Sequence, residues 1–230
     1  MQGHAERNLE EIKKDYPGLR LQSWNGDFAV YQGTLTFTAN YQGHGLIDGA
    51  FDVEIKFPIN GGRVAPTVKE VSGRIPRRPE FHINSDGTMC LGAPFEVRRR
   101  YLQDRSLRAF INQQLVPFLY GCSIKLRYNY WPYEELAHGG QGIIEYYQKL
   151  LDAETDLAVI ELLKVLSDGG FENNTLCACG SKKPFKKCHR LKIQKIKNQQ
   201  TREEFFSDFI ECIKVYVESG KKLPCHIMGL

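Results

Sequence analysis

Phe51-Asp52-Val53-Glu54-Ile55-Lys56-Phe57-Pro58 is the stretch of this chain with the clearest structural pattern. Apolar and charged residues alternate along it in strict period two, which is typical of an antiparallel strand with one face buried and one face in solvent. Pro58 cannot donate a hydrogen bond to a neighbouring strand, so we expect the strand to end there.

Weaker patterns on both sides of this strand predict a helix followed by a β-meander. Upstream, three apolar residues have helical spacing over residues 6–16, and two more alternate with threonines as in a strand. Downstream, a turn over residues 60–66 leads to a third short strand with two valines. In chain order these apolar residues are Leu9, Ile12, Tyr16, Leu35, Phe37, Val68 and Val71.

Helical spacing returns in the second half of the chain. We expect helices over about 102–119, with an end at Gly121, over 143–166 and over 202–218. An aromatic-rich strand or loop separates the first two, and its aromatic residues are Tyr128, Tyr130, Trp131 and Tyr133. Together with the strands, these helices predict an α+β fold.

Periodicity disappears between Gly73 and Phe95. An aperiodic segment of this length inside a compact domain is usually functional or disordered. Its apolar residues need burial and argue against disorder; they are Phe81, Ile83, Met89, Leu91 and Phe95. The segment is therefore predicted to be an ordered active-site loop.

Cys90 lies in this loop, after a tight-turn signal at Asp86-Gly87. The turn folds the chain back, so His82 and Asn84 are expected to approach Cys90. A thiol nucleophile needs an accessible thiolate and nearby donors that stabilise the tetrahedral intermediate, and a histidine ring and an asparagine amide are suitable donors. Two other interpretations stay open: Cys90 as a small buried apolar residue, and a cysteine–histidine hydrolase with a histidine base.

The same residues resemble a known family. His82-Ile83-Asn84, followed by Gly87-Thr88-Met89-Cys90-Leu91, looks like the His-Pro-Asn loop and the Cys-Leu catalytic site of ubiquitin-conjugating enzymes. Ile83 stands where the family has proline, and the loop from histidine to cysteine is shorter than usual. The resemblance covers about residues 20–137, and the predicted order of elements agrees with it. It implies a ubiquitin-conjugating-like fold: an N-terminal helix, an antiparallel β-meander, an active-site loop and C-terminal helices.

Transthiolation is the reaction that this resemblance implies. An activating enzyme would deliver the C-terminal carbonyl of a modifier, Cys90 would carry it as a thioester, and an amine on a target protein would accept it. Asn84 would orient and stabilise the oxyanion, and His82 would hold the loop rather than act as a base. Asp86 is the candidate that takes a proton from the substrate lysine.

The segment Tyr130-Trp131-Pro132-Tyr133-Glu134-Glu135-Leu136-Ala137-His138-Gly139 carries a second resemblance. It is similar to the C-terminal signature of the divergent bacterial members of the family, which are linked to ubiquitin-like conjugation in antiviral operons. In some short systems of this kind the protein that is joined is a cyclic-nucleotide synthase, through its C-terminus. His138 either approaches the site from below the sheet or stabilises a turn.

Cys177-Ala-Cys179-Gly-Ser-Lys-Lys-Pro-Phe-Lys-Lys-Cys188-His189 places four soft ligands within thirteen residues. Two pairs, Cys-x-Cys and Cys-His, suit a closed tetrahedral Zn²⁺ site. The spacing looks like the SEC-C motif, a small zinc-bound docking element. That resemblance implies structural zinc and a protein-binding role for the ligands Cys177, Cys179, Cys188 and His189.

The remaining cysteines carry weaker signals. Cys122 follows a predicted helix and opens an apolar strand, and Cys212 lies on the inward face of the last helix, so both are expected in the core. Cys225-His226 either adds a metal ligand or belongs to a frayed tail.

The net charge of +4 is concentrated in one segment. Of the 31 lysines and arginines, eight lie in residues 182–197, which contain no acidic residue, so the rest of the chain has 23 basic and 27 acidic residues. The segment is either a solvated helix face beside the metal site or a surface for an acidic protein or nucleic acid. No stretch of 18 apolar residues and no signal peptide is present, and seven cysteines in a chain of this length suit a reducing compartment, so we expect a cytoplasmic protein without a membrane partner.

These patterns predict a conjugating-like catalytic domain over residues 1–137, a helical extension over 138–170 and a SEC-C zinc module with a terminal helix over 171–230. The predicted function is that of a bacterial ubiquitin-conjugating-type thioester transferase whose partners are an activating enzyme, a modifier and a target. The alternatives are a catalytically inert conjugating-like scaffold and a nucleic-acid-binding protein that uses residues 182–197. The identity of the modifier and the oligomeric state are not in the sequence.

Overall fold

The computed structural model describes residues 11–41, 43–59, 64–133, 135–170 and 174–227. The chain forms two compact units, Met1–Glu135 and Leu136–Leu230. Leu9 of the predicted first helix lies outside the described residues, and residues 11–15 are helical. The predicted domain boundaries, at 137 and 170, stay predictions.

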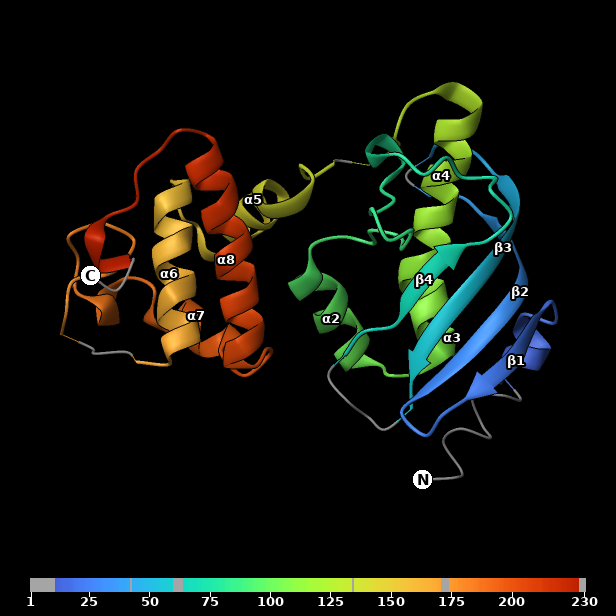
Figure 1. Ribbon diagram of the computed structural model, residues 1–230, viewed down its shortest axis with the longest axis horizontal. Helices are drawn as coiled ribbons and strands as arrows, with labels where there is room; N and C mark the ends of the chain where they lie inside the picture. The colour runs from blue at the N-terminus through green and yellow to red at the C-terminus, as the bar shows by residue number, and fades with distance from the viewer. Residues whose placement is uncertain (1–10, 42, 60–63, 134, 171–173, 228–230) are drawn as a thin grey trace. The chain divides into compact units, whose positions relative to one another are not determined.

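The first unit is built on one four-stranded antiparallel sheet, which confirms the predicted meander (Figure 1). Its strands follow one another in space as in sequence: β1 (Leu19–Trp24), β2 (Phe28–Ala39), β3 (Ile47–Pro58) and β4 (Thr67–Glu70). Along β3 the four apolar residues of the alternating stretch are all buried. Leu35 pairs with Phe51 and Tyr31 with Ile55, so β2 adds side chains to the same face.

The strand predicted as the third is β4, the fourth of the sheet, and it is shorter than its two valines predict. Val68 is buried in β4, but Val71 lies beyond the end of the strand and is exposed. The buried carboxylate of Glu70 accepts hydrogen bonds from the backbone N–H groups of Ser72 and Gly73, at 3.0 and 2.8 Å. These bonds turn the chain away from the sheet after Glu70.

Helices cover the buried face of the sheet. They are α2 (Pro94–Gln103), α3 (Leu107–Phe110), the π-helical turn η2 (Ile111–Leu115) and α4 (Val116–Tyr128). The core joins the strand residues to Leu107, Ile111, Leu115 and Leu119. Pro117 has no N–H for the carbonyl of residue 113, and the N–H of Val116 bonds to the carbonyl of Ile111 instead, which accounts for the π-helical turn.

The expected helix end at Gly121 is wrong, as is the strand expected to begin at Cys122. α4 continues to Tyr128, where Asn129 ends it in the left-handed conformation. Gly121 lies inside α4 because Trp131 and Tyr133 pack on it; a Cβ at this position would lie 3.1 Å from each side chain. Cys122 is fully buried in α4, so its predicted place in the core is confirmed.

The second unit is helical. Its elements are α5 (Gly139–Leu151), α6 (Asp156–Asp168), η3 (Phe185–Lys187), α7 (Arg190–Ile196), α8 (Arg202–Glu218) and η4 (Cys225–Ile227). The single helix predicted over 143–166 is two helices, because Asp152 ends α5 in the left-handed conformation and the Thr155 hydroxyl caps α6. The predicted bounds of α8 are confirmed, and Thr201 and Glu204 form a capping box at its start.

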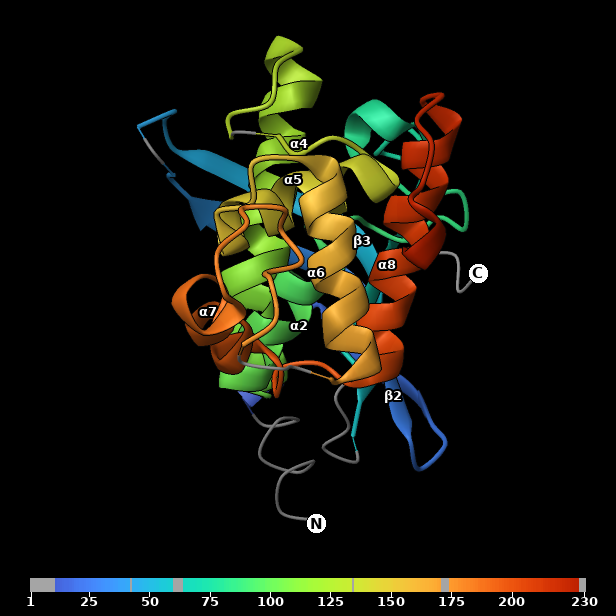
Figure 2. The same cartoon turned by 90° about the vertical axis from the view of Figure 1, so that its left-hand side faces the viewer.

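α6 and α8 lie side by side in both views (Figures 1 and 2), and α5 packs against both. A buried polar group joins α5 to α8: the hydroxyl of Tyr147 donates to Asp208 at 2.8 Å, and the amide of Gln200 donates to Asp208 at 3.0 Å. Cys212 is buried on the inward face of α8, as predicted.

Among the residues described, none of the helices combines the length and the apolar composition that crossing a bilayer requires.

The buried side chains of β3 are expected to contribute to the free energy of unfolding of the first unit. Ile55 is completely buried, so Ile55→Ala is expected to lower the free energy of unfolding by about 2–5 kcal/mol. Gln22→Ala, at an exposed position of β1, is the control and should change it by less than about 0.5 kcal/mol. Urea unfolding followed by tryptophan fluorescence measures both, because both tryptophans, Trp24 and Trp131, lie in the first unit. Equal effects of the two substitutions would contradict the observed sheet orientation.

Candidate active site and candidate metal centre

A short hairpin carries Cys90. Residues 82–84 run antiparallel to residues 88–90, with Ile83 paired to Met89. The N–H of Cys90 donates to the carbonyl of His82 at 2.7 Å, and the N–H of Asn84 donates to the carbonyl of Thr88 at 2.8 Å. The chain reverses at Asp86-Gly87 as predicted, and Gly87 has a φ of 84°, which favours glycine.

The hairpin is fixed to the domain on one side. Ile83 and Met89 are both buried in the core, and the N–H of Met89 donates to the carbonyl of Val68 in β4 at 2.8 Å. Side chains alternate between the two sides of an extended chain. The register therefore assigns Asn84, Thr88 and Cys90 to the other side, whereas His82 has a left-handed backbone, with a φ of 53°, and its ring is placed by its own contacts.

Cys90 is partly exposed. Its sulfur lies 3.9 Å from the carbonyl oxygen of Gly92, a weak contact that leaves the thiol accessible. His82 is directly across the hairpin from Cys90, and Asn84 is directly across from Thr88. The structure thus brings three predicted site residues onto one hairpin, and His82 is the cross-strand neighbour of the cysteine.

His82 is held by two side chains that the sequence interpretation did not single out. Its Nε2 lies 2.9 Å from a carboxylate oxygen of Glu135. Its ring stacks on the indole of Trp131, with centroids 4.9 Å apart and planes inclined by 10°. Phe118 packs edge-on against the same indole at 5.9 Å. Trp131 and Glu135 both belong to the segment Tyr130–Gly139. The resemblance of that segment was the feature of the sequence that could have identified them.

Asn84 and Asp86 form a hydrogen-bond chain through Thr88. The amide of Asn84 donates to the Thr88 hydroxyl at 3.0 Å, and that hydroxyl donates to Asp86 at 2.6 Å. Hydrogen bonds from the side chain and the backbone of Thr88 lower the pKa of Asp86. A carboxylate stabilised in this way is a weaker base than a free one. The observed effect of these hydrogen bonds is to hold the turn together. The catalytic roles of Asn84 and Asp86 stay predictions.

His138 lies in the second unit, at the N-cap of α5, and is exposed. Its expected approach to the Cys90 site therefore stays a prediction.

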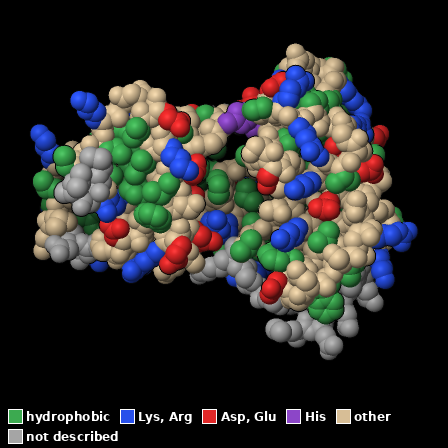
Figure 3. Space-filling view, viewed as in Figure 1, with side chains coloured by type: hydrophobic (Ala, Val, Ile, Leu, Met, Phe, Trp, Pro, Cys, Tyr) green, Lys and Arg blue, Asp and Glu red, His purple; other side chains and the backbone are tan. Residues whose placement is uncertain are grey.

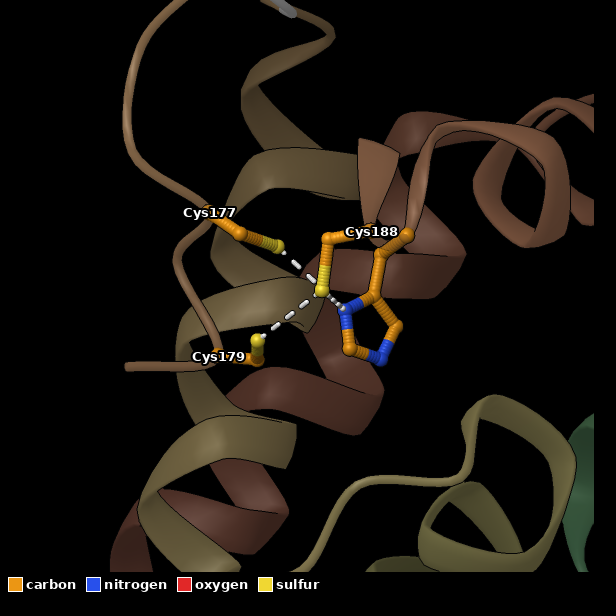
Figure 4. A group of neighbouring side chains, drawn as sticks. Cys177, Cys179 and Cys188 are labelled. Carbon is orange, nitrogen blue, oxygen red and sulfur yellow. Dashed lines mark hydrogen bonds between the residues drawn. The ribbon is translucent and has the colours of Figure 1, made fainter. Parts of the chain in front are cut away.

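The four predicted metal ligands converge. The ligand atoms of Cys177, Cys179, Cys188 and His189 all lie within 4.8 Å of one another. The Nδ1 atom of His189 is 3.3 Å from the sulfur of Cys177 and 3.1 Å from that of Cys188, and the sulfurs of Cys179 and Cys188 are 3.6 Å apart. Figure 4 shows the three labelled thiols pointing toward one another. The group can hold a metal ion, and Cys225 and His226 lie outside it.

Local backbone bonds shape this cluster. The N–H of Cys177 donates to the carbonyl of Lys183 at 2.8 Å, and that of Cys188 donates to Phe185 at 3.0 Å. The side chain of Phe185 is buried. Gly180, with a φ of 78°, allows the turn between the two ligand pairs.

The histidine of the cluster is prepared for metal binding. Its Nε2 lies 3.0 Å from the carbonyl oxygen of Leu151, an acceptor, so Nε2 carries the hydrogen and Nδ1 presents its lone pair to the thiols. Burial lowers the pKa of His189 and favours the neutral ring that binds metals. Burial also raises the pKa of Cys177 to about 12, so a cation is needed to hold that thiol deprotonated. The donor set therefore fits a soft or borderline divalent metal.

The basic segment lies around this cluster. Six lysines between residues 182 and 197 are exposed: Lys182, Lys183, Lys186, Lys187, Lys195 and Lys197. Lys192 instead forms an ion pair with Asp152. On the face of the first unit drawn in Figure 3, by contrast, basic and acidic side chains are interspersed. A partner for the lysine-rich segment stays a prediction.

Comparison of the chain with protein-family models, with curated proteins and with solved structures finds no match.

The different burial of the cysteines predicts their order of alkylation. Cys225 is exposed and Cys90 is partly exposed, whereas Cys122 and Cys212 are buried and burial raises the pKa of both thiols. Iodoacetamide should therefore modify Cys225 and Cys90 in the folded protein, and Cys122 and Cys212 only after unfolding. Peptide mass spectrometry over a time course measures this order. Modification of Cys90 no faster than that of Cys122 would show that its thiol is inaccessible.

Proposed function

We propose that this chain is a ubiquitin-conjugating-type acyl transferase in which Cys90 carries a modifier as a thioester. The observation that carries the proposal is the hairpin over residues 82–90. It is fixed to the core by Ile83 and Met89, and it carries the partly exposed thiol of Cys90, whose backbone pairs with that of His82. The resemblance of its residues to the His-Pro-Asn and Cys-Leu sites gives this geometry its chemical interpretation.

Two acyl transfers make up the proposed reaction. In the first, the Cys90 thiolate attacks the thioester carbonyl on the activating enzyme, a new C–S bond forms, and the enzyme's thiolate leaves with the electron pair. In the second, an amine attacks the carbonyl on Cys90, a C–N bond forms, the Cys90 thiolate leaves with the electron pair of the C–S bond, and the amine nitrogen loses a proton to that thiolate or to water. Both steps pass through a tetrahedral oxyanion that nearby donors stabilise.

The arrangement of elements supports the same proposal. The antiparallel meander β1–β4 leads through a single 3-10 turn, η1 (Pro79–Phe81), into the hairpin, and the helices follow. This is the order that the resemblance to conjugating enzymes implies. From the bacterial signature over residues 130–139 we further propose that the protein works with an activating enzyme in an antiviral system. The protein that it joins to a target would be a ubiquitin-like modifier or the C-terminus of a cyclic-nucleotide synthase.

We also propose that the four-ligand cluster holds a structural Zn²⁺. Three thiolates and one imidazole occupy all positions of a tetrahedral site, so no position remains for a reacting water. Zinc when bound would supply stability rather than catalysis. The surrounding lysines would offset the negative charge of three thiolates on one dication. The resemblance to the SEC-C motif suggests that the stapled loop docks a protein partner.

Replacing a ligand tests the metal proposal. Cys188→Ser should reduce the zinc content, measured by inductively coupled plasma mass spectrometry, from one ion per chain to much less than one. Because metal binding contributes about 10–16 kcal/mol in small zinc modules, the same variant should show an earlier unfolding transition of the second unit. Cys225→Ser, which changes an exposed cysteine outside the cluster, is the matched control. Equal zinc in both variants would overturn the ligand assignment.

Trapping the acyl enzyme tests the transferase proposal. The wild-type chain is mixed with ATP and with the activating enzyme and modifier encoded by adjoining genes, and we expect an adduct that dithiothreitol cleaves. Cys90→Ala should lose it, Cys90→Ser should form a thiol-resistant oxygen ester, and Cys225→Ser should behave as the wild type. A catalytically inert scaffold would bind the modifier without any adduct, and that outcome would refute the proposal. Release of a modifier-linked reporter without ATP would favour the hydrolase alternative instead.

A further inference from the structure

Burial divides the Cys/His cluster into two pairs of residues. Cys177 and His189 are buried, with 4% and 6% of their surfaces exposed. Cys179 and Cys188 are instead partly exposed. A small solute molecule can therefore reach two of the three thiols from the surface, whereas the protein covers the third thiol and the histidine.

The two accessible thiols are also neighbours in space. The sulfurs of Cys179 and Cys188 lie 3.6 Å apart, although the residues are nine positions apart in the chain. Figure 4 shows both side chains directed toward each other. The hydroxyl of Ser181, an exposed residue of the turn between them, is 3.3 Å from the Cys188 sulfur. This edge of the cluster therefore combines exposure with a second sulfur at short range.

Exposure by itself does not make a disulfide site. Cys225 is exposed and Cys90 is partly exposed, but both lie outside the cluster. Oxidation of a cysteine depends on the exposure of its thiolate, and a disulfide forms when a second thiol lies close enough to attack the oxidised sulfur. Cys179 and Cys188 meet both conditions.

We propose that Cys179 and Cys188 form an oxidation site, at which hydrogen peroxide converts the two thiolates to a disulfide and the metal ion is released. The inference rests on the proposed Zn²⁺ site and adds a reaction of its ligands to their structural role. A small hydroperoxide is the substrate class that the site would take, because the two sulfurs are only partly exposed.

The reaction balances with hydrogen peroxide as the oxidant. One thiolate attacks a peroxide oxygen, the O–O bond breaks, and a sulfenic acid forms while the hydroxide that leaves takes up a proton. The second thiolate then attacks the sulfur of the sulfenic acid, the S–S bond forms, and a second hydroxide leaves and is protonated. The two thiolates lose two electrons in total, and the peroxide accepts them as it becomes two water molecules.

Release of the metal follows from the number of ligands that remain. A disulfide removes both sulfurs as thiolate donors, which leaves Cys177 and His189. Structural zinc sites use four protein ligands, so two are too few to hold the ion tightly. A disulfide typically stabilises a small module by less than zinc binding does. Oxidation should therefore lower the stability of the loop that is proposed to dock a protein partner.

Zinc release and peptide mapping test the inference on the full chain. The zinc-loaded protein is treated with hydrogen peroxide, released zinc is measured with a chromogenic chelator, and the remaining thiols are blocked with N-ethylmaleimide. We expect the wild type to release its zinc as a disulfide between Cys179 and Cys188 appears in the unreduced peptide map. Trypsin separates these cysteines after Lys182, and fragmentation of the peptide distinguishes Cys179 from Cys177. Dithiothreitol and added zinc should restore the metal content, since a disulfide is reversible whereas a sulfinic acid is not.

Two matched variants separate the accessible pair from the buried thiol. Histidine is also a zinc ligand, so Cys179→His and Cys177→His each replace one thiol with another metal donor. The zinc content of both is measured before oxidation. Cys177→His keeps the proposed pair and should still release zinc as the wild type does. Cys179→His has lost the partner of Cys188 and should keep its zinc at the peroxide concentration that empties the wild type. Cys225→Ser is the control for an exposed cysteine outside the cluster.

The possible outcomes separate this inference from the zinc proposal. A disulfide that includes Cys177, or zinc release with sulfinic acid at one cysteine and no disulfide, would overturn the inference while the zinc proposal stands. Zinc that stays bound after peroxide has oxidised Cys225 would do the same. A wild-type chain that takes up no zinc would instead refute the zinc proposal, and the inference with it. If a histidine variant binds no zinc, the wild-type peptide map decides the pairing.

Discussion

Burial of Ile83 and Met89 beneath the 82–90 hairpin is the constraint on which the candidate active site depends. The pair joins the hairpin to the same core as the apolar face of β3. A backbone hydrogen bond from Met89 to Val68 ties it to the edge of β4. Because the buried pair fixes which side faces inward, it also fixes the side on which Cys90 and Asn84 lie. The reactivity that we propose is thus a consequence of core packing one residue away from the thiol.

A second constraint acts on the ring of His82. Trp131 and Glu135 hold it from the segment that follows α4, and this segment can lie close to α4 because Gly121 leaves room for the side chains of Trp131 and Tyr133. A helix glycine usually weakens a helix by about 1 kcal/mol relative to alanine. Here the missing Cβ lets the returning segment lie close to the helix. The packing of this segment on α4 therefore helps to position the side chains around His82.

The Cys/His cluster that could hold a metal ion depends on a different principle. Its four ligands lie within thirteen residues, and local turns at Gly180 and Phe185 bring them together, so little tertiary structure is required. A longer connection is the hydrogen bond from His189 to Leu151 at the end of α5, which orients the ring. Through it, the proposed zinc site would be linked to the helical core of the second unit, where α6 and α8 pack together.

The features that could be predicted from the sequence are those with a local physical signal: the alternating strand at residues 51–57, the turn at Asp86-Gly87, the bounds of α8 and the Cys/His group that could hold a metal ion. Periodicity and ligand spacing are patterns among residues that lie close together in the chain. Three features became visible in the folded chain alone: α4 continues past Gly121, the helical region after residue 143 is divided at Asp152, and Glu135 contacts His82. Those features depend on contacts between residues far apart in the chain, and side-chain shape at such contacts leaves no periodic trace in the sequence.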